Sequence, residues 1–240
     1  MDMGKVIIDG DILAYRAAFS TEQMGLQDTK DKVDDLIEYI LENTALLPYE
    51  IDVDYVVYLT GKDNFRYNIA KSYPYKGNRK SVQKPRHLQT ARDHMESKYK
   101  ATISKGEEAD DLIAKEAARL DYHACVASID KDMLQIPCWH FNIVRGDYLK
   151  VEPFGGIKFF YTQILTGDTA DNIVGLWKVG PVKAKKILED AETEEELWDL
   201  VVKAYDGNEE RVIENARLLW LRREEEEIWQ PPKVRSDNKL

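Results

Sequence analysis

The stretch Lys5-Val6-Ile7-Ile8-Asp9 decides the fold of this chain, because it is a short apolar run that ends in a carboxylate. Continuous apolar runs of this length are typical of strands that are covered on both faces. The residues that follow favour a helix through about Phe19, and we expect Asp11 to be its N-cap. The beginning of the chain therefore predicts a buried strand, an acid at its end, and a helix immediately after it.

Strand and helix patterns alternate as far as about residue 151. Strands are expected at 53–59, 101–103, 123–129 and 139–144, and helices at 30–46, 65–70, 85–100 and 108–120. This alternation predicts an α/β fold with a mostly parallel sheet flanked by helices, in which functional groups gather at the carboxyl ends of the strands.

After residue 151 the pattern becomes helical. Helices are expected at 156–165, 183–188, 194–205 and 209–228, with a glycine-bounded hairpin near 175–180. We therefore expect an α/β core over 1–151, a helical region over 152–230, and a disordered polar tail over 231–240.

Composition narrows the class of protein. The 240 residues are 43% hydrophobic and 10% aromatic, which is ordinary for a globular protein, and no apolar stretch approaches the length of a membrane span. The first residues do not resemble a signal peptide. Two cysteines, Cys125 and Cys138, are too few for a disulfide scaffold or a zinc site and are expected in buried strands. We therefore expect a cytoplasmic protein with no membrane partner.

The charge is unevenly distributed along the chain. The net charge is −10, yet residues 62–105 contain 12 basic and 3 acidic side chains, a net of +9, which leaves −19 for the rest. A basic block inside an acidic protein is the electrostatic footprint of a phosphate-rich partner, although a solvated charged surface would look the same.

Acidic residues stand at the ends of the predicted elements. They follow two strands, open one helix and flank a glycine-containing turn: Asp9, Glu108, Asp110, Asp111, Asp130, Asp132, Asp168 and Asp171. Each one alone could be a helix cap. Two carboxylates 4 Å apart repel by about 4 kcal/mol at an effective dielectric constant near 20, so a convergent group needs raised pKa values or bound cations. Oxygen ligands without an organised His or Cys set favour Mg²⁺ or Mn²⁺.

A phosphate-binding block together with a carboxylate site suggests phosphoryl transfer with two metal ions. A rival interpretation is Asp9-Gly10-Asp11, a strand-end DxD similar to that of haloacid-dehalogenase-type phosphatases. In that family a Thr usually follows at the position where this chain has Leu13.

Six motifs in order resemble the 5′-nuclease superfamily of flap endonucleases and 5′→3′ exonucleases. They are Val6-Ile7-Ile8-Asp9-Gly10 with Leu13-Ala14-Tyr15-Arg16-Ala17, Phe65-Arg66 with Tyr75-Lys76-Gly77-Asn78-Arg79, Gly106 to Asp111, Ser128 to Asp132, Leu165 to Asn172, and Gly175 to Leu188. The arch sequence Tyr75 to Lys80 with Lys84-Pro85 looks most like phage-encoded enzymes. The resemblance covers about three quarters of the chain and implies a PIN-like fold with a basic helical arch over about 62–105 and a helix–hairpin–helix-type element over about 170–190.

The resemblance also implies roles for particular residues. The eight acids would bind divalent metal, and Lys76 and Arg79 would hold the scissile phosphate and act on its charge. DNA contacts are implied for Arg66, Tyr75, Lys80, Gly180, Lys183, Lys185 and Lys186.

Two departures from the family pattern concern ion binding. Many relatives carry an Asp at the end of the second strand, where this chain has Leu59, with Asp63 nearby. In the hairpin, Lys178 replaces a usual glycine, and this disfavours the monovalent cation that relatives bind there.

The sequence thus predicts a Mg²⁺- or Mn²⁺-dependent 5′→3′ exonuclease of phage DNA replication, with flap-endonuclease or RNase H-like activity. Its partners would be duplex DNA with a free 5′ end or flap, RNA–DNA hybrids, and replication proteins. The alternatives are a non-catalytic nucleic-acid-binding module and a small-molecule phosphatase.

Overall fold

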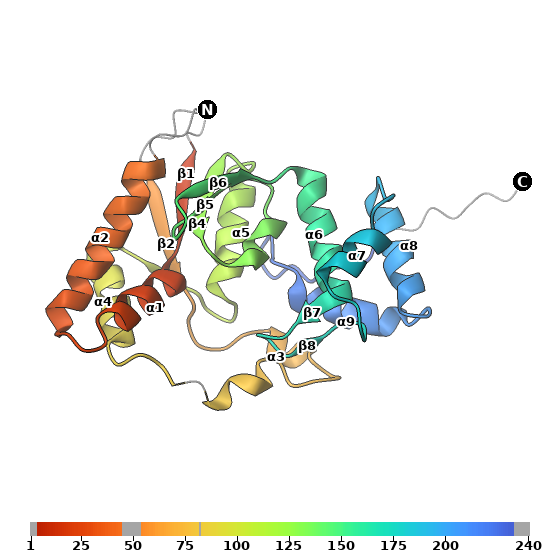
Figure 1. The fold of residues 1–240 in the computed structure, drawn as a ribbon, viewed down its shortest axis with the longest axis horizontal. Coiled ribbons are helices and arrows are strands. Elements are labelled where there is room, and N and C mark those ends of the chain that lie inside the picture. Colours follow the sequence, from red (N-terminus) through yellow and green to blue (C-terminus); the bar gives the residue numbers. More distant parts are fainter. Residues whose placement is uncertain (1–3, 45–53, 82, 233–240) are drawn as a thin grey trace, which may run out of the picture. The chain divides into compact units, whose positions relative to one another are not determined.

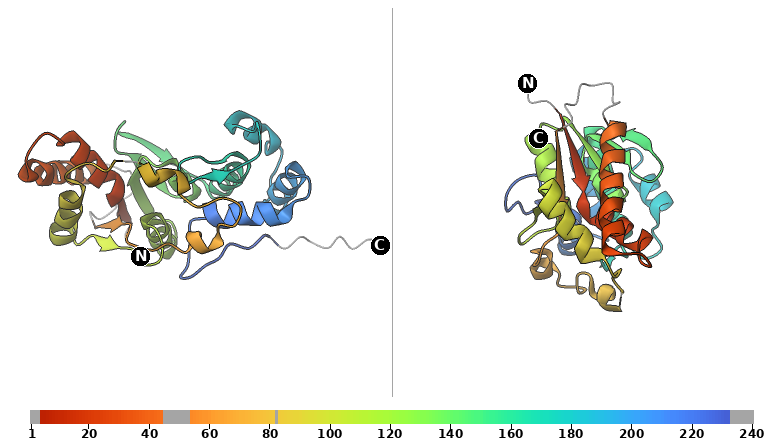
Figure 2. Two further views of the ribbon diagram at one scale, coloured as in Figure 1. Left: turned by 90° about the horizontal axis from the view of Figure 1, so that it is seen from below. Right: turned by 90° about the vertical axis from the view of Figure 1, so that its left-hand side faces the viewer.

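The computed structural model describes residues 4–44, 54–81 and 83–232, which form two compact units (Figures 1 and 2). Among these residues the first unit comprises 4–44, 54–65, 83–152 and 221–226, and the second comprises 66–81, 153–220 and 227–232. The change of pattern after residue 151 matches the boundary near 152. However, residues 66–81 of the expected arch pack with the second unit, and residues 221–226 return to the first. The expected disordered tail lies largely outside the described residues.

The first unit is built on a six-stranded sheet with the order β3-β2-β1-β4-β5-β6. Its strands are β1 Lys5–Asp9, β2 Tyr55–Leu59, β3 Thr102–Ile103, β4 Ala124–Ser128, β5 Trp139–Asn142 and β6 Asp147–Lys150. All neighbours are parallel except β5 and β6, which form an antiparallel pair. The expected mostly parallel α/β sheet is confirmed, and the short edge strand β6 is an element that the sequence pattern did not reveal.

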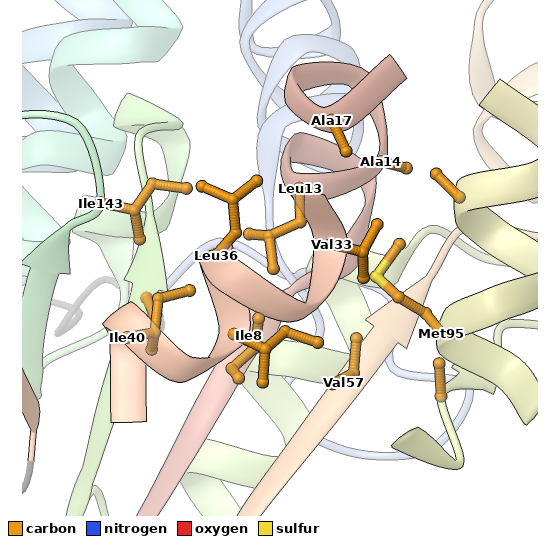
Figure 3. Packing of buried hydrophobic residues seen from close by; sticks show 14 of the residues in the cluster. Ile8, Leu13, Ala14, Ala17, Val33, Leu36, Ile40, Val57, Met95 and Ile143 are labelled. Carbon is orange, nitrogen blue, oxygen red and sulfur yellow. The ribbon is translucent and has the colours of Figure 1, made fainter. Parts of the chain in front are cut away.

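Helices cover both faces of this sheet. They are α1 Gly10–Ser20, α2 Leu26–Thr44, α4 Leu88–Tyr99 and α5 Ala109–Arg119, with a 3₁₀ turn η2 at Lys131–Gln135. Successive side chains of a strand point to opposite faces. Val6 and Ile8 of β1 therefore pack with α1, α2 and α4, whereas Ile7 packs with α5. Figure 3 shows the first of these cores, where Ile8 and Leu13 lie close to Val33 and Met95.

The turn from β1 into α1 is tight. The helix begins at Gly10, and its N-cap is Asp9 rather than the expected Asp11. A Cβ on Gly10 would lie 2.6 Å from the carbonyl oxygen of Tyr58, so only glycine allows the helix to start against β2. Asp11 instead accepts a hydrogen bond from the backbone N–H of Thr60 and pairs with Arg92.

The second unit is helical, with one small ladder. Its elements are α3 Arg66–Ile69, η1 Gly77–Ser81, α6 Pro153–Thr166, β7 Gly167–Asp168, β8 Ile173–Val174, α7 Pro181–Ile187, α8 Glu194–Ala204 and α9 Glu209–Leu219. The core comes mainly from α6, α8 and α9 and includes Phe160, Trp198 and Trp220. Helix α9 ends at Leu219, so the expected helix over 209–228 is too long. None of the helices within the described ranges is long and apolar enough to cross a membrane.

Candidate active site

Asp9 stands at the carboxyl end of the central strand, and its side chain is only 3% exposed. Its carboxylate accepts hydrogen bonds from the backbone N–H of Ile12 (3.1 Å) and from the hydroxyl of Ser128 (2.6 Å). Burial raises the pKa of Asp9 to about 7, the two hydrogen bonds lower it in part, and Asp11 and Asp130 raise it further. The carboxylate is therefore held in a place where its negative charge is unfavourable.

Three further acids begin helix α5. Glu108 is the N-cap and forms a capping box with Asp111, whose carboxylate accepts the Glu108 backbone N–H at 3.1 Å. Asp111 is fully buried, and its other oxygen accepts the backbone N–H of Arg222. One oxygen of Asp111 thus caps the start of α5 and the other holds the backbone of Arg222, and this occupation by backbone donors disfavours its predicted role as a metal ligand.

Asp110, in the first turn of α5, has a strongly raised pKa. Burial raises its pKa well above the ordinary value, and the charges of Asp9, Glu108 and Asp130 raise it further, with a smaller contribution from Asp111. Acids from the ends of β1 and β4 and from the start of α5 therefore influence one another, as the convergence of parallel strands predicted.

The end of β4 supplies the last two acids of the first unit. Asp130 caps η2 by accepting the backbone N–H of Asp132 at 2.9 Å. The backbone N–H of Asp130 donates to the Ser128 hydroxyl at 3.0 Å, and that hydroxyl in turn donates to Asp9. Ser128 therefore fixes two acids at once, a role that the sequence pattern did not reveal although the residue lay in a quoted motif.

The donor set of the first unit consists of oxygen alone and fits a hard divalent cation. Within the described residues, no three His, Cys, Asp or Glu side chains are arranged so that they could hold an ion as they stand. Burial first, and repulsion from neighbouring acids second, raise the pKa values of Asp9 and Asp110. A cation would relieve this repulsion, and the side chains would have to close around it.

Asp168 and Asp171 belong to the second unit. Asp168 is buried and accepts the backbone N–H of Ala170 at 2.7 Å. Asp171 accepts hydrogen bonds from the Tyr75 hydroxyl at 2.7 Å and from the Arg79 guanidinium at 2.5 Å, and the Lys76 ammonium lies 3.8 Å away. The two basic residues expected to hold the scissile phosphate are thus gathered on one carboxylate.

Two residues expected to contact DNA are part of the core of the second unit. Arg66 is 2% exposed, and its guanidinium donates to the backbone carbonyl oxygens of Leu218 and Trp220. Tyr75 is 4% exposed, and its ring packs in the same core. This burial disfavours the predicted DNA contacts of Arg66 and Tyr75.

The basic residues of α7 remain on the surface, because Lys183, Lys185 and Lys186 are all exposed. Gly180 is the N-cap of this helix, with open space around its Cα. Lys178 adopts the left-handed conformation with φ of 59°, a conformation that favours glycine. Lys80 belongs to η1. Leu59, which stands where many relatives carry an Asp at the end of the second strand, is buried, and the nearby Asp63 is exposed.

The family model of the 5′-3′ exonuclease N-terminal resolvase-like domain matches residues 5–155. This match spans more than half of the chain and includes six of the eight acids, all of them in the first unit. The chain belongs to this 5′-3′ exonuclease family.

Similar proteins agree with this assignment. A 5′-3′ exonuclease of Buchnera aphidicola subsp. Schizaphis graminum is 27% identical over 73% of this chain and 66% of its own length. The flap endonuclease Xni of Shewanella baltica is 32% identical over 48% of this chain and 50% of its own length. The chain thus spans between half and just under two thirds of these relatives.

Among solved structures, a flap endonuclease of bacteriophage T5, in a pseudo-enzyme-product complex with DNA and metal ions, matches with a TM-score of 0.70. It is 17% identical and covers 90% of this chain, with 88% of its own chain covered. A T5 5′-exonuclease structure with bound zinc gives a TM-score of 0.67. These likenesses show a shared fold.

Proposed function

We propose that the protein is a divalent-metal-dependent nuclease that hydrolyses DNA phosphodiesters from the 5′ end and also cuts 5′ flaps. The observation that carries this proposal is the group of acids at the ends of β1 and β4 and at the start of α5, where burial and then the charges of neighbouring acids raise the pKa of both Asp9 and Asp110. Family membership supports the same reaction, and the metal ions and DNA in the neighbouring structures support the cofactor and the substrate.

The residues proposed to hold Mg²⁺ or Mn²⁺ are acids of both units. Asp9, Glu108, Asp110 and Asp130 form the central group, Asp132 lies beside it in the sequence, and Asp168 and Asp171 come from the second unit. When bound, two such ions supply a hydroxide nucleophile and stabilise the attacking and leaving oxygens. Asp111 and Ser128 would act indirectly, since they fix the start of α5 and the orientation of Asp9.

Lys76 and Arg79 are proposed to bind the scissile phosphate. Their shared partner Asp171 holds both cations in one place, and a phosphate could take over their hydrogen bonds. A preorganised cation is most effective where negative charge grows in the transition state. The remaining charges of residues 62–105 and the lysines of α7 would hold DNA by its phosphates, without reading sequence.

The finer expectations follow from the same proposal. The products would be 5′-phosphate and 3′-hydroxyl ends, and the biological setting would be phage DNA replication. RNA–DNA hybrids are a second substrate of the same chemistry. A non-catalytic binding module is disfavoured, because acids repel DNA phosphates and would only weaken binding. A small-molecule phosphatase would have no use for the basic residues of α7.

The decisive experiment compares wild type with Asp130→Asn on 5′- and 3′-labelled duplex, flap and hybrid substrates, with Mg²⁺ or EDTA. We expect Mg²⁺-dependent cleavage by wild type and its loss in Asp130→Asn, with equal or tighter DNA binding, since the variant removes a ligand and a repelling charge. Asp35→Asn is a matched control, because Asp35 is an exposed acid of α2. Cleavage by Asp130→Asn within about threefold of wild type would remove Asp130 from the site.

A further inference from the structure

The hairpin that precedes α7 and the first turn of α7 each expose a large apolar side chain. Trp177 and Val182 are each 86% exposed, more than any other large apolar residue of the described chain. The other tryptophans described, by contrast, are largely covered, with Trp198, Trp220 and Trp229 all in the core of the second unit. Large apolar side chains held in water are costly, and such exposure commonly marks a binding surface.

The backbone of the hairpin is well fixed beneath these side chains. The Leu176 N–H donates to the carbonyl oxygen of Leu165, and the Val179 N–H donates to that of Leu176. Gly175 lies so close to Gly167 that a Cβ on either residue would meet backbone at 2.3 Å. The exposed ring of Trp177 is therefore carried by an anchored turn.

All charged residues near Trp177 in the sequence are basic. Between Val174 and Leu188 the chain has four lysines and no acid. The ammonium of Lys178 lies 5.8 Å from the centre of the Trp177 ring, in cation–π contact, although Lys178 must adopt a left-handed backbone to place it there. Lys183, Lys185 and Lys186 are exposed on the helix that follows.

We infer that Trp177 stacks on a nucleobase that is accessible at a gap or frayed end of DNA, while the lysines of α7 hold the neighbouring phosphates. An exposed aromatic ring among cations is the arrangement that binds unpaired bases irrespective of sequence. The exposed lysines of α7 favour DNA over an uncharged partner, because each of them can pair with a phosphate, and the experiment below distinguishes a second copy of the chain. This inference rests on the proposed function, because it requires DNA as the partner.

The two kinds of contact can be separated by their salt dependence. Each lysine–phosphate contact contributes about −0.9 to the slope of log K against log salt, whereas base stacking contributes nothing to that slope. Losing one stacked base weakens binding by about fivefold to 150-fold. Trp177→Ala should therefore bind gapped DNA at least about fivefold more weakly with an unchanged slope, and Lys183→Ala should make the slope shallower by about 0.9.

The test uses the full chain with Ca²⁺ and two probes: an intact duplex containing 2-aminopurine, and the same duplex with a one-nucleotide gap beside the 2-aminopurine. We expect wild type to quench the fluorescence of the gapped probe more strongly than that of the intact one. Trp177→Ala should lose the quenching and the extra affinity, and Trp177→Phe should keep most of both. Circular dichroism establishes that each variant is folded.

Several outcomes would overturn the inference. One is that Trp177→Ala binds and quenches the gapped probe as strongly as wild type does. Another is that Trp177→Ala loses the same affinity for the intact probe as for the gapped one. A third is that wild type sediments as a dimer and Trp177→Ala as a monomer. Cleavage in Mg²⁺ is measured separately. A wild type that cleaves DNA while Trp177→Ala binds normally overturns only the inference, whereas a wild type that neither binds nor cleaves DNA overturns the proposed function itself.

Discussion

Replacing Asp9 by Asn should stabilise the metal-free protein at neutral and alkaline pH. The folded state raises the pKa of this carboxyl from 3.8 to about 7, mainly by burial. The folded protein therefore holds the proton more tightly than the unfolded chain, and its stability falls as pH rises from about 4 to about 7. Asn stays neutral throughout this range and can still accept the Ile12 N–H.

The size of the effect follows from the shift. About three pKa units at 1.36 kcal/mol each correspond to about 4 kcal/mol of unfolding free energy. Part of this penalty is already present at pH 5, so the advantage of Asp9→Asn over wild type should grow by about 2–3 kcal/mol between pH 5 and pH 8. Mg²⁺ at pH 8 should stabilise wild type, because it compensates the charge, and should stabilise the variant much less.

Urea unfolding in EDTA at several pH values, followed by circular dichroism, measures this difference. Asp35→Asn serves as the control, since Asp35 is exposed on α2 and its removal should change the pH dependence little. Parallel pH profiles for wild type and Asp9→Asn would refute the reasoning, as would a variant that is less stable than wild type at pH 8 by the same margin as at pH 5.

Three further substitutions test other assignments. Arg66→Met should lower the unfolding free energy by about 3 kcal/mol, because it leaves two buried carbonyl oxygens without their donor. The folded variant should bind DNA as wild type does. Weaker binding without a loss of stability would instead place Arg66 on the DNA-binding surface. Lys178→Gly should raise the unfolding free energy by about 1 kcal/mol, because glycine adopts positive φ without strain. The increase in Tm should be about 2–4 °C. A lower Tm would show that the left-handed backbone of Lys178 is not strained. Lys76→Ala should slow single-turnover cleavage about 10²–10³-fold and weaken binding in Ca²⁺ far less; normal cleavage at saturating enzyme would make Lys76 one of many phosphate contacts.

The apolar runs of the sequence determined the sheet. Each predicted strand of the core overlaps an observed one, because a run such as Val6-Ile7-Ile8 can be buried on both faces only in the interior of a parallel sheet. The edge strand β6 escaped prediction because Asp147–Lys150 is exposed and is held by its pairing with β5, a contact that no local pattern reveals.

The acids were visible in the sequence, but their individual roles were not. Spacing could place Asp9, Asp110 and Asp111 at element ends, and it could not distinguish a carboxylate that repels its neighbours from one that caps a helix. Asp111 accepts the Glu108 N–H at the start of its own helix, and its second oxygen is occupied because the distant backbone N–H of Arg222 reaches it. The same holds for Asp9, whose raised pKa depends on burial by the finished fold.

Basic residues show the same division between sequence and tertiary structure. The charge of residues 62–105 is a property of composition, yet Arg66 within it points into a core made by α9, about 150 residues later in the chain. Lys183, by contrast, is exposed on the surface of α7. Contacts between segments far apart in sequence decide which internal acceptors a charged side chain reaches, as the pairing of Lys76 and Arg79 with Asp171 also shows.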